Sequence, residues 1–223
     1  MEIVTPFSQQ DQCLRRGQCC RMGSATLHVA DAELIINSTV KYSDLFTIRE
    51  GELVYNNLDD EFITIDYELI KINEKEGSRT CSFFVEDGSV CTIYEHRPAQ
   101  CKAYECWNTE GFANTFNEEK LTREHLMAGN NSLLDIIRTH EDRCSYARLA
   151  ELVGMIRDGK DVVAEVFEAL SYDDALRALM REKLGIDASY MPLMLGRPLV
   201  DTIIMFGYKV EKDQDGNNCL MVL

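Results

Sequence analysis

The spacing of apolar positions divides the chain into two parts. Up to about Trp107, apolar residues come in short runs with partial alternation, a pattern typical of short strands. Beyond Trp107, they recur every three or four residues, as on the buried faces of amphipathic helices. We therefore predict an α+β fold in which small antiparallel β hairpins and loops surround a cysteine-bound metal site and pack on a mainly helical C-terminal half.

These two parts also predict the domain organisation. Residues 1–110 are expected to form the cysteine-rich region with the hairpins, and residues 111–223 the helical region with a terminal β hairpin. Because a chain of 223 residues can share one core, we expect one continuous globular unit.

The first part predicts one short helix and several strands. Asp31 is a candidate N-cap for a helix that runs to Ile36. Residues 45–48 and 53–55 flank the polar residues 49–52, a pattern that predicts a hairpin. Strands are also expected at residues 62–65 and 67–72, and a second hairpin is expected to pair residues 81–85 with 90–94.

The second part predicts helices with recognisable boundaries. Thr122 is a candidate cap of a short helix, and a longer helix is expected from Ser132 to Arg157. Further amphipathic helices are expected at residues 161–170 and 172–184, with the terminal hairpin formed by residues 205–210 and 219–222.

The charge of the chain limits its partners. With 23 Lys and Arg against 38 Asp and Glu, the formal net charge is −15. General binders of nucleic acids or anionic membranes need a positive surface, so we expect neither kind of partner. A protein or small-molecule partner fits the composition, but the sequence does not identify it.

The cysteines point to a reducing compartment. The N-terminus lacks the charged start and apolar run of a signal peptide, and no later stretch is apolar for long enough to cross a bilayer. We therefore expect a cytoplasmic protein, in which clustered thiols serve metals or catalysis more often than disulfides. The alternative, a disulfide framework in a secreted protein, agrees less well with the odd count of 9 cysteines.

Most of the cysteines fall into two groups. The first group lies in CLRRGQCC, where a turn at Gly17 could bring Cys13 towards Cys19 or Cys20. Adjacent side chains diverge, so Cys19 and Cys20 either serve two metals or only one of them is a ligand. The second group lies in CSFFVEDGSVCTIYEHRPAQCKAYEC: the predicted hairpin brings Cys81 and Cys91 within reach of a shared centre, and Cys101 and Cys106 follow on a short helical turn or loop.

Basic residues accompany both groups in this acidic protein. They are Arg15, Arg16 and Arg21 beside the first group, and Arg79, Arg97 and Lys102 beside the second. Positive charge near a thiol lowers its pKa and favours the thiolate that binds metal. The alternative is that these are solvated surface side chains.

A further pair of candidate ligands lies on the predicted helix after Ser132. His140 and Cys144 are one turn apart and share its apolar face, so they could present a nitrogen and a sulfur to one site. The alternative is a partly buried histidine and a small core cysteine. We expect Cys144 as an extra ligand, with His140 second.

The cysteine pattern, and CTIYEHRPAQC at residues 91–101 in particular, resembles that of the YkgJ-type cysteine-cluster proteins. The resemblance covers about residues 13–107. It implies a zinc- or iron-chelating domain whose metal-binding motif comprises seven cysteines, namely Cys13, Cys19, Cys20, Cys81, Cys91, Cys101 and Cys106. This chain has C-x5-CC where the usual pattern has a further cysteine in the gap. The same domain occurs in flagellin lysine N-methylases, which makes a methyltransferase relative a further alternative, although the chain has no glycine-rich nucleotide loop.

The chemistry of these thiols allows more than one cofactor. We predict an iron–sulfur cluster or iron held by cysteine thiolates, with a redox or catalytic role, because structural zinc sites usually contain short CxxC knuckles and this chain has none. The alternatives are a structural zinc site in an interaction module and a protein that passes a metal on. No nucleophile and base can be paired from the sequence, so it does not decide whether the protein is an enzyme.

Overall fold

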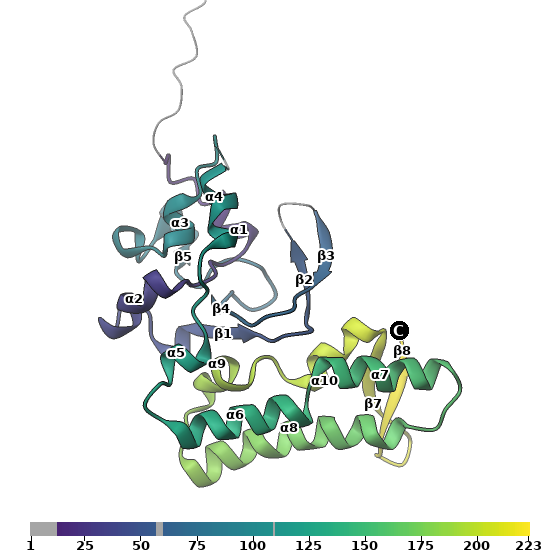
Figure 1. Ribbon diagram of the computed structural model, residues 1–223. Helices are drawn as coiled ribbons and strands as arrows, with labels where there is room; N and C mark the ends of the chain where they lie inside the picture. The colour runs from purple at the N-terminus through teal and green to yellow at the C-terminus, as the bar shows by residue number, and fades with distance from the viewer. Residues whose placement is uncertain (1–12, 57–59, 109) are drawn as a thin grey trace, which may run out of the picture.

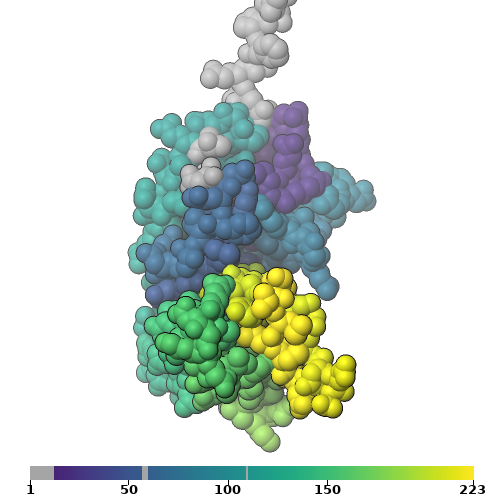
Figure 2. All heavy atoms as spheres, turned by 90° about the vertical axis from the view of Figure 1, so that its right-hand side faces the viewer, coloured from purple at the N-terminus to yellow at the C-terminus, as the bar shows by residue number. Residues whose placement is uncertain are grey.

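The computed structural model describes residues 13–56, 60–108 and 110–223, so the first residues of the predicted 1–110 region lie outside it. Figure 1 shows two parts, with the short elements that carry most cysteines above and the long helices α6, α7 and α8 below. The side view in Figure 2 likewise places the segments before about residue 110 on top of the green and yellow C-terminal half. The predicted fold class is confirmed: small antiparallel two-stranded sheets accompany a helical C-terminal half.

The described elements have the following bounds. The strands are β1 Leu45–Ile48, β2 Leu53–Asn56, β3 Glu61–Thr64, β4 Leu69–Ile72, β5 Phe84–Val85, β6 Val90–Cys91, β7 Tyr208–Lys212 and β8 Asn218–Val222. The helices are α1 Gln18–Met22, α2 Ala32–Ile36, α3 Ala99–Ala103, α4 Glu110–Asn114, α5 Arg123–Leu126, α6 Asn131–Arg143, α7 Tyr146–Arg157, α8 Val163–Leu184, α9 Met191–Leu195 and α10 Leu199–Thr202.

The first four strands pair differently from the prediction. β1 pairs with β4 and β2 with β3, both antiparallel, so the expected hairpin of residues 45–48 with 53–55 is wrong. Gly51 N–H donates to Ile65 O at 2.8 Å, which links the two pairs into one long bent ribbon. The polar residues 49–52 predicted a turn, but Arg49 and Glu52 are buried in ion pairs at the bend.

Two helix boundaries also differ from the prediction. The helix expected from Ser132 to Arg157 breaks into α6 and α7 at Cys144, because the Ser145 hydroxyl accepts a hydrogen bond from Arg148 N–H and caps a new helix. The helices expected at residues 161–170 and 172–184 form a single helix, α8, which ends at Gly185 as predicted. The single residue between them, Ser171, interrupts the apolar pattern but is neither a glycine nor a proline, so it does not end the helix.

The apolar residues form two buried clusters. One lies between the β1–β4 pair and helices α6, α8 and α9, and includes Leu45, Ile70, Ile137, Met180 and Leu193. It contains residues from both halves of the chain and therefore joins the cysteine-rich part to the helices. The other cluster lies among α7, α8 and α10 and the terminal hairpin, and includes Leu149, Val166, Leu199 and Tyr208.

Across the described parts of the chain, no helix combines the length and the apolar character needed to cross a membrane.

Candidate metal centre

Three short segments bring most of the cysteines together. They are α1 with Cys19 and Cys20, the β5–β6 hairpin with Cys91 on β6 and Cys81 three residues before β5, and α3 with Cys101, all in the upper part of Figure 1. The predicted hairpin of residues 81–85 with 90–94 is thus shorter than expected, since only residues 84–85 and 90–91 pair, and Cys81 instead bridges to Glu74. Cys81 N–H donates to Cys20 O at 2.8 Å, so the backbone of the first cysteine group is fixed directly to that of the second.

Gly17 allows α1 to approach the hairpin. It precedes α1 with a φ of 72°, in the left-handed region that favours glycine. A Cβ atom at this position would lie 2.2 Å from the ring of the buried Phe84 on β5. The chain therefore enters α1 through a left-handed glycine, and the missing side chain lets the first cysteine group pack on the second.

The position of α3 depends on polar contacts with the segment before α2. Asp31 was expected to cap α2, but its carboxylate instead accepts hydrogen bonds from His28 N–H at 3.0 Å and from Ala99 N–H at 2.8 Å. Gln100 Oε1 accepts a hydrogen bond from Thr26 N–H at 2.7 Å. These contacts hold the N-terminal turn of α3, and with it Cys101, beside the strand pairs.

The vicinal thiols of α1 interact with each other. Cys19 Sγ and Cys20 Sγ are 4.0 Å apart. Hydrogen bonding from Cys20 lowers the pKa of Cys19 to about 6, and the positive charge of Arg97 acts in the same direction. The same hydrogen bond raises the pKa of Cys20. Of this pair, Cys19 is therefore the thiol more readily ionised.

The remaining thiols of the group influence one another through their charges. Burial raises the pKa of Cys81 and of Cys91. Cys101 retains contact with solvent, but desolvation by the surrounding protein raises its pKa, and the negative charges of Cys81, Cys19 and Cys91 add to the effect. Thiolates close enough to repel one another in this way form an environment that a bound cation would stabilise.

Two arginines lie near the cysteine-bearing segments. The guanidinium carbons of Arg15 and Arg97 lie 3.8 Å and 4.0 Å from the centre of the Tyr94 ring. Arg97 Nη1 also donates to Tyr94 O at 3.1 Å, and its charge lowers the pKa of Cys19 and of Cys91. The charge of Arg97 therefore favours the first of the two interpretations left open by the sequence, whereas the position of Tyr94 between two cations was not predicted.

Cys13 and Cys106 lie at the edge of the group. Cys13 is exposed, and its Sγ accepts a hydrogen bond from Arg15 N–H at 3.4 Å. Cys106 is exposed and follows α3 in the segment where Glu105 bridges to Asn108. Desolvation is the main cause that raises the pKa of Tyr104, and the charges of Cys19 and Cys106 raise it further. Tyr104 therefore lies within electrostatic range of both thiols.

The donor set agrees with a soft metal, although the thiols do not form a closed shell. Within residues 13–56, 60–108 and 110–223, no three His, Cys, Asp or Glu side chains are arranged closely enough to hold an ion. Cys19, Cys20, Cys81, Cys91 and Cys101 nevertheless interact electrostatically beside an arginine. Thiolate sulfur is the ligand that zinc, copper(I) and iron–sulfur clusters prefer.

His140 and Cys144 have partners in the helical half. His140 is completely buried, and its Nε2 lies 2.7 Å from Asp173 Oδ1. Cys144 is buried in the cluster of α7 and α8, and its Sγ donates to Ala169 O at 3.6 Å. Figure 1 places the end of α6 away from α1 and α3. The structure therefore does not bring these two residues to the other cysteines, and we leave them out of the proposed ligands.

The contacts of Asp173 predict an acid-sensitive fold. Burial would raise its pKa, but hydrogen bonds from His140, Arg177 and Leu199 N–H outweigh this effect and lower it to about 2. Since the folded pKa is depressed, the stabilisation is complete above the unfolded pKa of 3.8 and is lost as the pH falls towards about 2. Burial also lowers the pKa of His140 below its usual 6.5. Below that pH this histidine is protonated more readily in the unfolded chain than in the folded protein, which also destabilises the fold as the pH falls.

In urea unfolding experiments, we expect the contribution of Asp173 to lower the free energy of unfolding by roughly 2 kcal/mol between pH 4 and pH 2. Asp173→Asn should be less stable at pH 7 and show a smaller loss over the same range. An equal loss in both proteins would contradict this assignment.

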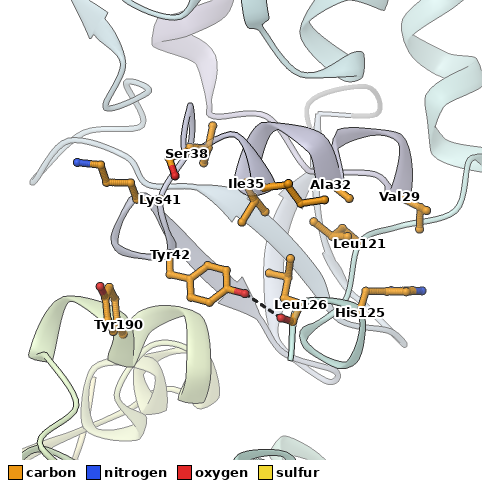
Figure 3. Close-up of a pocket in the computed structure, with 12 residues that line it drawn as sticks. Val29, Ala32, Ile35, Ser38, Lys41, Tyr42, Leu121, His125, Leu126 and Tyr190 are labelled. Carbon is orange, nitrogen blue, oxygen red and sulfur yellow. Dashed lines mark hydrogen bonds between the residues drawn. The ribbon is translucent and has the colours of Figure 1, made fainter. Parts of the chain in front are cut away.

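A separate groove contains no cysteine. It has a volume of about 550 Å³ and lies between α2, the loop before β1, and α5. Figure 3 shows its apolar wall of Ile35, Leu121 and Leu126, and Tyr42, whose hydroxyl donates to Leu126 O at 2.8 Å. Its lining residues are mainly apolar and include none of the thiols, so the groove is a separate feature from the cysteine group.

Comparison with protein families agrees with the cysteine pattern. Residues 11–122 match the family model named CxxCxxCC, described as "Putative zinc- or iron-chelating domain". The chain belongs to this family. The match covers α1, the bent ribbon, the β5–β6 hairpin and α3, and therefore all seven cysteines of the predicted motif. No curated protein and no solved structure matches the chain.

Membership supports metal binding by a zinc- or iron-chelating domain. The family name gives the first cysteine group as C-x-x-C-x-x-C-C, and in this chain Cys13, Cys19 and Cys20 fill three of its positions while Arg16 stands at the other. The predicted resemblance to a cysteine-cluster family is confirmed, together with the departure at this position.

Proposed function

We propose that the cysteine-rich part binds iron through thiolates, as an iron–sulfur cluster, and that the protein acts in electron transfer or redox catalysis. The observation that supports this most directly is the meeting of three separate cysteine-bearing segments, where Cys81 N–H donates to Cys20 O at 2.8 Å and the charges of Cys81, Cys19 and Cys91 help to raise the pKa of Cys101. Four thiolates are the usual ligand set of such clusters, and the bound group would supply one-electron chemistry.

The surrounding residues support this proposal over a purely structural site. Arg97 offsets part of the negative charge of Cys19 and Cys91, and nearby charge is one of the features that set a cluster potential. Arg15 adds a second cation across Tyr94. Solvent also reaches Cys19 and Cys101, so a partner could approach the centre closely.

Structural zinc is the second candidate, and the short elements around the thiols favour it. Neither α1 nor α3 contains a buried residue, and β5 and β6 have two residues each. Elements of this length gain little from their own packing, so a metal that cross-links them would stabilise them. In this case the helical half would serve as the binding surface for a protein or small-molecule partner.

Protein purified without oxygen distinguishes these functions. We expect a brown sample with broad visible absorption, containing iron and acid-labile sulfide in stoichiometric amounts. A colourless sample with stoichiometric zinc would contradict the iron proposal and support the structural one. Protein that contains neither metal, and binds neither when supplied anaerobically, would contradict both.

A further inference from the structure

Arg21, on α1, contacts the β5–β6 hairpin through both its charge and its planar face. Its Nε donates to Glu86 Oε1 at 3.3 Å and to Oε2 at 3.0 Å, and its Nη2 donates to Oε2 at 2.6 Å. Its guanidinium carbon lies 4.6 Å from the centre of the Phe84 ring. Both side chains of the ion pair retain contact with solvent, but the paired hydrogen bonds and the ring give it a fixed geometry that an isolated surface ion pair lacks.

The same arginine fixes the turn that leads into α1. Its Nη1 donates to Arg16 O at 3.0 Å, and its backbone N–H donates to Gly17 O at 3.2 Å. Since a Cβ atom at Gly17 would lie 2.2 Å from the Phe84 ring, the turn and the Arg21 side chain both pack on this ring. Phe84 is buried and is the cross-strand partner of Cys91, so these contacts connect the first cysteine group to the second.

The position of α1 depends on contacts of this kind. All five residues of α1 are described, and none of them is buried. A helix of one turn is not stable by itself, so contacts with other segments must hold it in place. Cys81 N–H and Arg79 Nε also donate to α1, but both end on its backbone carbonyls. Arg21, by contrast, joins a side chain of α1 to the turn and the buried ring of the hairpin.

We infer that Arg21 is a positioning residue of the metal centre, which holds Cys19 towards Cys91 through its contacts with Glu86 and Phe84. This inference rests on the proposed metal-binding function. Two of the four proposed ligands, Cys19 on α1 and Cys91 on β6, lie on the two elements that Arg21 joins. Groups that hold metal ligands in position change metal affinity by about 10- to 100-fold when they are removed.

Hydrogen exchange of the metal-free, reduced protein tests the position of α1 without metal. Isotopic labelling of the cysteine amide nitrogens follows the amide of Cys81, which donates to α1, beside that of Cys144 in the helical half. Arg21→Met and Glu86→Met should each accelerate exchange at Cys81 roughly 10-fold and leave Cys144 unchanged. The double variant should exchange no faster than either single variant, because the two side chains form one contact.

Cobalt(II) titration of the same proteins without oxygen tests the effect on the thiols. Folded Arg21→Met and Glu86→Met should each bind cobalt roughly 10-fold more weakly than the wild type. Arg21→Lys, which keeps the charge but lacks the planar fork, should lie between Arg21→Met and the wild type. Arg148→Met is the matched control, because it removes an exposed ion pair with Glu151 on α7 and should change neither the exchange rates nor the affinity.

The outcomes separate this inference from the function on which it rests. If the wild type binds cobalt and the Arg21 and Glu86 variants bind it equally well, the inference is wrong and metal binding stands, whatever the exchange rates. Equal acceleration at Cys81 and Cys144 would show a general loss of stability and would also overturn the inference. If the wild type binds no cobalt, both the inference and the proposed metal binding are wrong.

Discussion

Cys101→Ser is expected to lose bound metal. Desolvation raises the pKa of Cys101, and the charges of Cys81, Cys19 and Cys91 add to this effect, so its sulfur lies within electrostatic range of the other thiols. A serine hydroxyl is not ionised at neutral pH and is a poor ligand for soft metals, so we expect affinity to fall roughly 100-fold. Metal analysis of protein purified without oxygen, followed by a competition titration with a chelator, would measure the loss.

Two other cysteines serve as controls for this variant. Cys219 lies on the terminal strand β8, where its Sγ donates to Glu211 O at 3.3 Å. Cys144 lies in the helical core. Cys219→Ser should retain both wild-type metal content and wild-type stability, whereas Cys144→Ser should retain metal but lose stability. If Cys101→Ser and Cys219→Ser held equal amounts of metal, the proposed ligand set would be wrong.

The short elements that carry most of the cysteines could largely be predicted from local sequence signals. The glycine of CLRRGQCC indicated the turn before α1, and the turn residues 86–89 indicated the β5–β6 hairpin. These features depend on backbone conformation within a few residues, which local sequence specifies well. The strand segments and the end of α8 at Gly185 were predictable for the same reason.

Features that depend on distant residues could not be predicted in this way. The polar residues 49–52 indicated an exposed turn, because nothing local shows that Glu141 and Arg197 pair with them from other elements. Asp31 has the sequence of a helix cap, yet its carboxylate binds Ala99 N–H, 68 residues later. The pattern on α6 placed His140 and Cys144 on one buried face, but it could not show that Asp173 and Ala169 are their partners.

The most unusual of these long-range features is the fully buried Arg49. Its Nε lies 2.9 Å from both carboxylate oxygens of Glu141, and its Nη2 donates to Cys144 O at 2.8 Å. Arg123 shares Glu141 through a contact of 2.8 Å. The side chain fits because residue 196 is glycine, where a Cβ atom would lie 2.7 Å from Arg49 Cδ. Arg49 thus joins the end of β1, in the cysteine-rich part, to α6 in the helical half.

Arg49→Met should therefore be strongly destabilising. Methionine fills part of the volume but leaves Glu141 with Arg123 alone and removes the donor to the buried Cys144 carbonyl, so we expect the free energy of unfolding to fall by about 3–5 kcal/mol. Arg138→Met, on the same helix as Glu141, removes two ion pairs of an arginine side chain that is 59% exposed, and should cost less than about 1 kcal/mol. Urea unfolding of the two variants and the wild type would measure both changes.

Metal content then shows whether the two halves depend on each other. The polar and ring contacts of Arg49 are made to Glu141, the Cys144 carbonyl, Tyr146 and Glu52, which lie on α6, at the start of α7 and in the bend of the ribbon, and none of these residues is a proposed ligand of the centre. Folded Arg49→Met protein should therefore bind as much metal as the wild type, although it should unfold at a lower urea concentration. Equal stability of the Arg49 and Arg138 variants would contradict the structural role of the buried pair, whereas loss of metal from folded Arg49→Met would show that the helical half positions the thiols.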